Sequence, residues 1–267
     1  MVVIGLCSVA TASAQTPSPF AYWQNSTGIA LLPLAGPPPE WRIQIGPGVV
    51  ALPIYEGADS TRLLPSPEFD IRYRDIAFAS AGDGLGVNLL RGQNYRAGIA
   101  LGYDVGREHN LATRLSGTGN VDPTPEAKVV AEYALLPLVV STDIRQGMIG
   151  HQGLIGDLGV YMPIAGNETF DIFLGPAITV ADTEYMQSYF GISTAQVMGS
   201  RAHFPPYQAR GGLKDATLGV TAIYHFTDQL FTDASATWER LADSAGNSPI
   251  VQTRDEFGVS VTVGYQF

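Results

Sequence analysis

From residue 41 onward, apolar and polar side chains alternate in stretches of about ten residues, which are separated by turn-forming residues. The last stretch, 257–267, is the clearest. Apolar and aromatic side chains hold its odd positions, and glycine, serine, threonine and glutamine hold its even ones. Successive side chains of a β-strand point to opposite faces, so the pattern predicts strands with one apolar and one polar face.

The polar face of these segments carries charges of both signs. Between residues 68 and 74, two acids and two arginines alternate with apolar side chains. A soluble β-sandwich would turn such a face to bulk water, whereas a membrane barrel encloses it in a lumen, where opposite charges pair across strands. We favour the barrel, and its predicted lumen-lining residues are Glu68, Asp70, Arg72, Arg74, Arg96, Asp104, Glu126, Lys128, Glu132, Asp143, Arg145, Asp215, Asp233 and Glu239.

The strand count follows from the alternating segments. These are 42–54, 63–73, 76–90, 95–106, 125–135, 138–146, 153–162, 169–181, 213–225, 230–240 and 257–267. The third changes phase at Gly82-Asp83-Gly84, which predicts a tight turn between two strands. Because bacterial single-chain barrels have even strand numbers, we predict an all-β fold, an antiparallel transmembrane β-barrel of about 12 strands (10–12).

Connections between these segments differ in length. The short ones, 136–137, 166–168 and 227–229, are predicted to be periplasmic turns, and the long ones, 107–124, 182–212 and 241–256, extracellular loops. In the longest loop, residues 185–190 predict a short helix packed into or over the barrel mouth.

The N-terminal region differs from the rest of the chain. Residues 2–10 form a short apolar stretch, and Ala12-Ser13-Ala14 has the pattern of a cleavage site. Residues 15–40 are rich in proline, which cannot donate to a strand ladder. We therefore expect a signal peptide at 1–14, a periplasmic tail at 15–40 and the barrel at 41–267.

Composition limits the partners and the kinds of functional site that the chain can have. The net charge of −10 argues against nucleic acid as a partner, and the single cysteine lies in the predicted signal peptide. The histidines lack metal-ligand spacing. His151 and Ser141 form the most plausible histidine–serine pair, but Ser141 shares the predicted lumen face with charged residues and is interpreted as part of a polar network. We expect no enzymatic activity, no catalytic residues, no metal site and no cofactor.

The predicted final strand ends in Val263, Tyr265 and Phe267 on one face. A terminal strand of this kind resembles the signal that the barrel assembly machinery reads. The expected location is the Gram-negative outer membrane, with outer-membrane lipid and that machinery as partners.

Two motifs resemble the MipA/OmpV family of outer-membrane proteins: Tyr185-Met186-Gln187-Ser188-Tyr189-Phe190-Gly191, and Gly212-Leu213-Lys214-Asp215. Shorter matches extend the resemblance from about residue 40 to the end. The resemblance implies an outer-membrane barrel without agreed catalytic residues. It also implies, for one branch, a scaffold that links a murein transglycosylase to a penicillin-binding protein.

The lumen charges leave two functions open. They could line a porin-like channel for small solutes, or they could pair and close a narrow lumen. A non-enzymatic structural or scaffolding role in the cell envelope is our first hypothesis, and the channel is the alternative.

Overall fold

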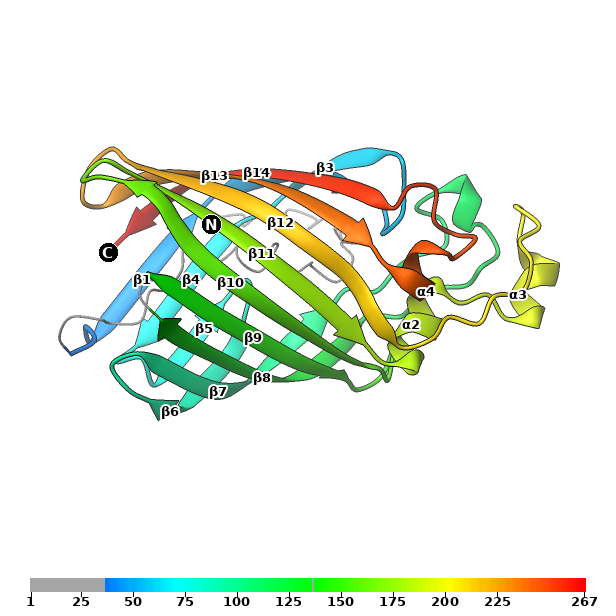
Figure 1. The fold of residues 1–267 in the computed structure, drawn as a ribbon, viewed down its shortest axis with the longest axis horizontal. Helices are drawn as coiled ribbons and strands as arrows, with labels where there is room; N and C mark the ends of the chain where they lie inside the picture. Colours follow the sequence, from blue (N-terminus) through cyan, green and yellow to red (C-terminus); the bar gives the residue numbers. More distant parts are fainter. Residues whose placement is uncertain (1–36, 136) are drawn as a thin grey trace, which may run out of the picture.

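The structure, a computed structural model, describes residues 37–135 and 137–267. The predicted signal peptide and most of the proline-rich tail lie outside the described residues. The chain forms a long antiparallel barrel with small helices at one end (Figure 1). Among the described residues, no helix combines the length and apolar character needed to cross a membrane.

The described residues form fourteen strands in one sheet. In chain order they are β1 (Trp41–Gly46), β2 (Gly48–Pro53), β3 (Thr61–Pro65), β4 (Glu68–Tyr73), β5 (Ala77–Ser80), β6 (Gly84–Arg91), β7 (Tyr95–Asp104), β8 (Thr124–Leu135), β9 (Leu138–Gly147), β10 (Leu154–Gly166), β11 (Phe170–Ala181), β12 (Gly212–His225), β13 (Leu230–Leu241) and β14 (Asp255–Gln266).

Two interruptions make the number of strands larger than the number of staves, by which we mean the positions around the barrel wall that one continuous strand would fill. Pro47 divides β1 from β2, and both pair with β14, which closes the barrel. Ser66 and Pro67 likewise divide β3 from β4, which pair with β2 and β1. Proline lacks the N–H that a ladder needs, so each pair is one broken stave. Fourteen strands less two interruptions leave twelve staves, which confirms the predicted closed antiparallel barrel.

The side chains are arranged as the alternation predicts. In the middle of β14, Val261 is 43% exposed on the outside, whereas Thr262 is 3% exposed on the inside. The same contrast runs around the barrel, where the exposed side chains are mostly Leu, Ile, Val and aromatic residues and the buried ones include many charged groups. An apolar exterior is stable in lipid, which removes the need for an apolar core.

The predicted turn at 82–84 is confirmed, because residues 81–83 form the turn between β5 and β6. The preceding connection corrects one lumen prediction. Arg74 follows β4 in a turn, with a φ of 49°, and its side chain is 54% exposed and pairs with Glu40. The alternation that begins at Glu68 therefore ends before Arg74, which does not line the lumen.

The two ends of the barrel differ. We call the end with the short connections 136–137, 167–169 and 226–229 the turn end; β14 also finishes there. The connections 105–123, 182–211 and 242–254 form the loop end (Figure 1), which contains η1 (Thr113–Leu115), α2 (Thr183–Phe190), α3 (Thr194–Gly199) and α4 (Asp243–Gly246). The predicted helix at 185–190 is confirmed as part of α2.

Candidate functional site

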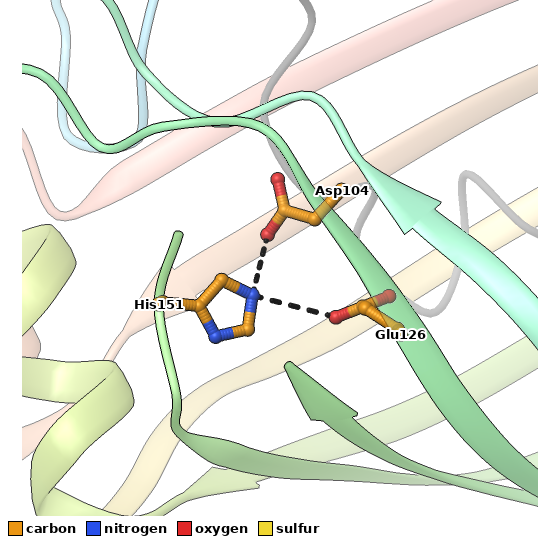
Figure 2. Close-up of side chains that lie close together, drawn as sticks. All are labelled: Asp104, Glu126 and His151. Atoms are coloured by element: carbon orange, nitrogen blue, oxygen red, sulfur yellow. Dashed lines mark ion pairs between the residues drawn. The ribbon is translucent and has the colours of Figure 1, made fainter. Parts of the chain in front are cut away.

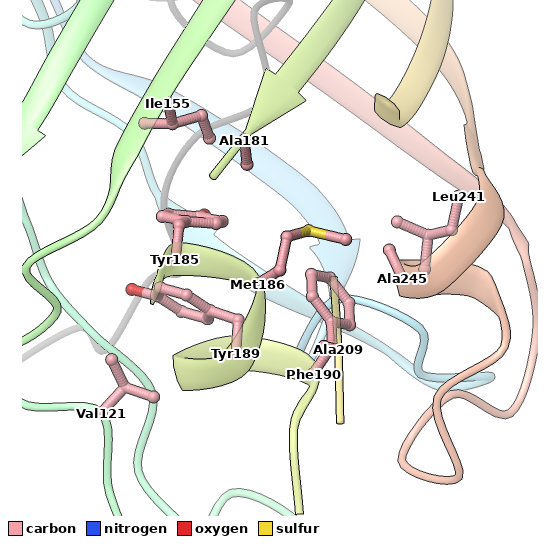
Figure 3. Packing of buried hydrophobic residues seen from close by; sticks show 10 residues of the cluster. All are labelled: Val121, Ile155, Ala181, Tyr185, Met186, Tyr189, Phe190, Ala209, Leu241 and Ala245. Carbon is pink, nitrogen blue, oxygen red and sulfur yellow. The ribbon is translucent and has the colours of Figure 1, made fainter. Parts of the chain in front are cut away.

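Helix α2, which we call the α2 plug, lies at the mouth of the loop end. Asp182 starts it by accepting a hydrogen bond from the Tyr185 N–H at 2.8 Å. Its apolar side chains pack against residues from the ends of strands and from the neighbouring loops (Figure 3). The members of this cluster are Val121, Ile155, Ala181, Tyr185, Met186, Tyr189, Phe190, Ala209, Leu241 and Ala245. Burial of this cluster holds the plug in the mouth.

Polar contacts fix the plug to three other segments. The Tyr189 hydroxyl donates to Asp104 Oδ2 at 2.6 Å, at the end of β7. The Ser248 hydroxyl donates to the Phe190 carbonyl at 2.6 Å, and Arg107 donates to the Tyr189 carbonyl. Because these partners come from the β7–β8 and β13–β14 sides of the barrel, the plug bridges its mouth.

Beneath the plug lies a group that we call the histidine cluster: Asp104 at the end of β7, Glu126 in β8 and His151 in the β9–β10 connection (Figure 2). His151 Nε2 is 3.0 Å from Asp104 Oδ2 and 3.5 Å from Glu126 Oε1. All three side chains are buried. One oxygen or nitrogen from each lies within 4.8 Å of the others, an arrangement that could hold a cation.

The surroundings of His151 favour positive charge. Burial lowers the pKa of the imidazole, but the Asp104 and Glu126 carboxyl groups outweigh burial and raise the pKa of His151 to about 9. The rings of Tyr185 and Tyr189 lie edge-on to the imidazole at centroid distances of 5.1 and 5.8 Å. The plug therefore shields the cluster from solvent.

Gly147 makes room for the imidazole. A Cβ at this position would lie 2.5 Å from His151 Cε1 and 2.6 Å from His151 Nδ1, closer than real Cβ contacts allow. A side chain at the end of β9 would therefore push His151 away from the two carboxyl groups.

Ion pairs fill one side of the lumen. Arg72 contacts Asp70 at 2.8 Å along β4. Arg96 on β7 contacts Asp75 at 3.1 Å and also pairs with Glu132. Both guanidinium groups are almost fully buried, so each cation depends on its acidic partners.

The network continues across β8, β9 and β10. Lys128 contacts Asp143 at 2.8 Å. Arg145 contacts Asp157 at 2.6 Å, Asp143 at 3.3 Å and Glu126 at 3.9 Å. Arg145 is fully buried and connects the lumen network to the histidine cluster through Glu126.

Across the barrel, Lys214 gathers three acids. It contacts Asp215 at 2.7 Å and Glu239 at 3.6 Å, and it also pairs with Glu56 in the β2–β3 connection. Simple alternation cannot bury both Lys214 and Asp215. The register shift between Thr179 and Val180 leaves Lys214 as an extra residue on β12, and this bulge places it inside the barrel with Asp215.

The other predicted lumen residues are also inside the barrel, except Arg74. Glu68 and Asp233 are each 2% exposed. Glu132 and Asp143 are partly accessible because they line a lumen cavity of about 30 Å³. Such a cavity holds about two waters. Its lining residues are Arg72, Phe78, Asp83, Asn88, Arg96, Val130, Ala131, Glu132, Ser141, Thr142 and Asp143.

Ser141 and His151 do not come together. Ser141 is six residues before the end of β9, about 20 Å along the strand from Gly147, against which His151 packs. Asp157 and Lys214 were not among the predicted lumen residues, and Asp104 and Glu126 were predicted to line the lumen but not to meet His151. Asp157 has the same parity as Ile155 and Gly159, so the alternation could have indicated it, whereas no sequence pattern joins His151 to two distant strands.

Val263, Tyr265 and Phe267, the residues of the predicted assembly signal, lie on the outer surface and are exposed. The Tyr265 and Phe267 rings are in contact, with centroids 4.8 Å apart. They form an aromatic face at the turn end of β14.

Comparison with known proteins agrees with this architecture. The model of the family "MltA-interacting protein MipA" matches residues 45–267. The outer membrane protein Omp26La of Vibrio anguillarum is 24% identical over 74% of this chain and 71% of its own length. The outer membrane protein OmpV of Vibrio cholerae is 24% identical over 65% of this chain, which spans 64% of that relative's length.

Solved structures similar to the chain include the NanC porin, at 9% identity with a TM-score of 0.41, covering 85% of this chain and 100% of that one. They also include the COG4313 outer membrane channel of Pseudomonas putida F1, at 8% identity with a TM-score of 0.42, covering 90% of this chain and 100% of that one. The barrel, its apolar exterior and the match over residues 45–267 together place this chain in the MltA-interacting protein MipA family of outer-membrane β-barrel proteins.

Proposed function

We propose that this protein is a closed, non-enzymatic barrel with a structural or scaffolding role in the cell envelope. The observation that supports this most directly is the α2 plug, whose four buried apolar side chains occupy the mouth of the loop end. Short turns face the periplasm in bacterial barrels, so the plugged loop end faces outward. A closed barrel displays its surfaces to partners rather than passing solutes.

The paired lumen charges support the same function. Arg72, Arg96, Lys128 and Arg145 each contact at least one carboxylate. The cavity of about 30 Å³ among them is far smaller than a ligand pocket of roughly 300 Å³ or more. A solute would have to separate buried ion pairs to pass this level.

Absence of catalysis is part of the proposal. His151 faces two carboxyl groups rather than a serine, and the strand distance between Ser141 and Gly147 leaves Ser141 without a general base in His151. The test compares outer-membrane lipid from cells that express the unmodified protein with lipid from cells that express His151→Ala. We expect no difference.

Planar-bilayer conductance of the refolded chain tests closure, with mobility on gels before and after heating as the check on folding. We expect a folded barrel without discrete conductance steps. A variant with residues 183–190 replaced by a glycine–serine linker separates the two barriers. Conductance by this variant would show that the plug alone closes the barrel, and a folded but silent variant would show that the paired lumen charges also close it. Stable channels in the unmodified protein would contradict closure.

The scaffold partner that we propose is a murein transglycosylase of the MltA type, named in the description of the family. It would bind at the turn end, with a penicillin-binding protein as the second enzyme. Crosslinking of the full chain to a purified MltA-type enzyme tests this proposal. A matched variant with residues 15–40 deleted separates binding by the tail from binding by the turns, and absence of any crosslink refutes the partner.

The alternative is a porin-like channel for small solutes. The observation that favours it is the mixture of charges inside the barrel, which would provide selectivity once the plug moved aside. Conductance by the unmodified protein, changed in ion selectivity by Lys128→Gln, would support this alternative.

A further inference from the structure

We propose that Asp104, Glu126 and His151 form a binding site for one divalent transition-metal ion of the Zn²⁺ class at the loop end of the barrel. The proposal is independent of the scaffolding role, which requires no ion. It departs from the expectation drawn from histidine spacing, because the site combines one histidine with two carboxylates from other strands.

The spacing of the three side chains fits a tetrahedral ion. Zinc–nitrogen and zinc–oxygen bonds of about 2.0–2.2 Å place neighbouring ligand atoms about 3.3–3.5 Å apart. His151 Nε2 lies 3.0 Å from Asp104 Oδ2 and 3.5 Å from Glu126 Oε1, and the three ligand atoms all lie within 4.8 Å of one another. His151 Nε2 and Asp104 Oδ2 would separate by a few tenths of an ångström to reach this spacing, and the distance between His151 Nε2 and Glu126 Oε1 already fits it.

Two of the three facing atoms lack a hydrogen bond of good geometry. His151 Nε2 and Glu126 Oε1 are buried and lie 3.5 Å apart without such a bond, whereas Asp104 Oδ2 accepts from the Tyr189 hydroxyl. Figure 2 shows the imidazole nitrogen facing both carboxyl groups. Buried polar atoms that face one another without such bonds need a cation between them or a proton shared among them.

Ligand type selects the ion. Two carboxyl groups and one imidazole are the ligand types that Zn²⁺ takes in proteins. Imidazole suits Zn²⁺ and its neighbours in the first transition row. Calcium takes 6–8 oxygen ligands, whereas the cluster offers carboxyl groups from only Asp104 and Glu126, so we expect Ca²⁺ to bind much more weakly.

The surroundings hold the ligands in place. The Gly106 N–H donates to Asp104 Oδ1 at 2.7 Å, and the Tyr189 hydroxyl donates to Oδ2 of the same group. Arg145 approaches the other carboxyl group, with Nε 3.9 Å from Glu126 Oε2. Partners of this kind orient metal ligands and strengthen their binding. A bound ion would tie β7, β8 and the β9–β10 connection together beneath the α2 plug.

The experiment uses the full chain purified from outer membranes in detergent and stripped with a chelator. Zn²⁺ is titrated by calorimetry, and bound metal is counted after dialysis. We expect one Zn²⁺ per chain, and His151→Gln should weaken binding by at least about tenfold. The matched control is His109→Gln/His203→Gln, which removes two exposed loop histidines and should leave binding unchanged.

Two further measurements keep the test decisive if His151→Gln folds poorly. Glu126→Gln preserves size and removes one charge, and it should also weaken binding. On the unmodified chain, Co²⁺ should give the visible absorption of a four-coordinate site, and Zn²⁺ should raise the unfolding temperature. The proposal is overturned if the unmodified chain binds no stoichiometric metal, if both cluster variants bind as tightly as it does, or if only the control loses binding.

Discussion

Two ion pairs of nearly equal length allow the effect of burial to be measured in this barrel. Arg145 contacts Asp157 at 2.6 Å with the two side chains 0% and 6% exposed. Arg240 contacts Asp255 at 2.7 Å with the side chains 53% and 39% exposed. We predict that Arg145→Met destabilises the barrel much more than Arg240→Met does.

The magnitude follows from what each substitution leaves behind. Arg145→Met leaves Asp143, Asp157 and Glu126 without their shared cation, and removing one partner of a buried pair costs about 3–5 kcal/mol. Arg240→Met leaves an acid that solvent can stabilise, so the loss should be below about 1 kcal/mol.

The assay is reversible unfolding in guanidinium chloride in the presence of lipid vesicles, followed by the fluorescence of the protein's three tryptophans and by gel mobility. A double-mutant cycle adds Asp157→Asn, which neutralises one stranded acid. The double variant should recover about 1–3 kcal/mol relative to the sum of the single losses.

Equal losses for Arg145→Met and Arg240→Met would refute the reasoning, because burial would then not set the strength of the pair. A strictly additive cycle would show that Arg145 and Asp157 are not energetically coupled in spite of their contact.

Further predictions concern other positions. Gly147→Ala should displace the His151 imidazole and lower the free energy of unfolding by about 1–3 kcal/mol in the same assay. An unchanged free energy would show that the backbone at the end of β9 moves aside without destabilising the barrel. Tyr189→Phe should cost about 1 kcal/mol by removing the hydrogen bond to Asp104, and it should increase protease cleavage in residues 182–211, whereas an unchanged cleavage pattern would contradict that bond's role in holding the plug. Val261→Arg, in the middle of β14 on the lipid face, should cost about 2–4 kcal/mol; a cost no larger than that of Arg240→Met would argue against lipid at this surface. Phe267→Ala should lower the amount of barrel assembled in the outer membrane while leaving refolded stability within about 0.5 kcal/mol, and unimpaired assembly would remove Phe267 from the recognition signal.

The barrel could be predicted from the sequence because its determinants are local. Alternation with a period of two assigns each strand residue to one face, and lipid requires the apolar face to be outside. The phase change at Gly82-Asp83-Gly84 located the β5–β6 turn for the same reason. The broken staves at Pro47 and at Ser66-Pro67 did not obscure the count, because the alternating segments continue past them.

Local pattern failed where the backbone departs from regular strand. Arg74 continues the alternation of β4 in sequence, but a turn residue with positive φ points its side chain to solvent. Lys214 breaks the alternation in sequence, yet the bulge on β12 carries it inside. Bulges and turns depend on how neighbouring strands pair, and a single strand's sequence does not contain that information.

The histidine cluster depended entirely on tertiary structure. Asp104, Glu126 and His151 come from the ends of two strands and from a connection, and their spacing in sequence matches no ligand motif. Closure of the barrel brings these segments to one level, and the α2 plug then seals the group from solvent. Period and polarity determined the barrel, whereas contacts between segments far apart in the chain decided which buried charges meet.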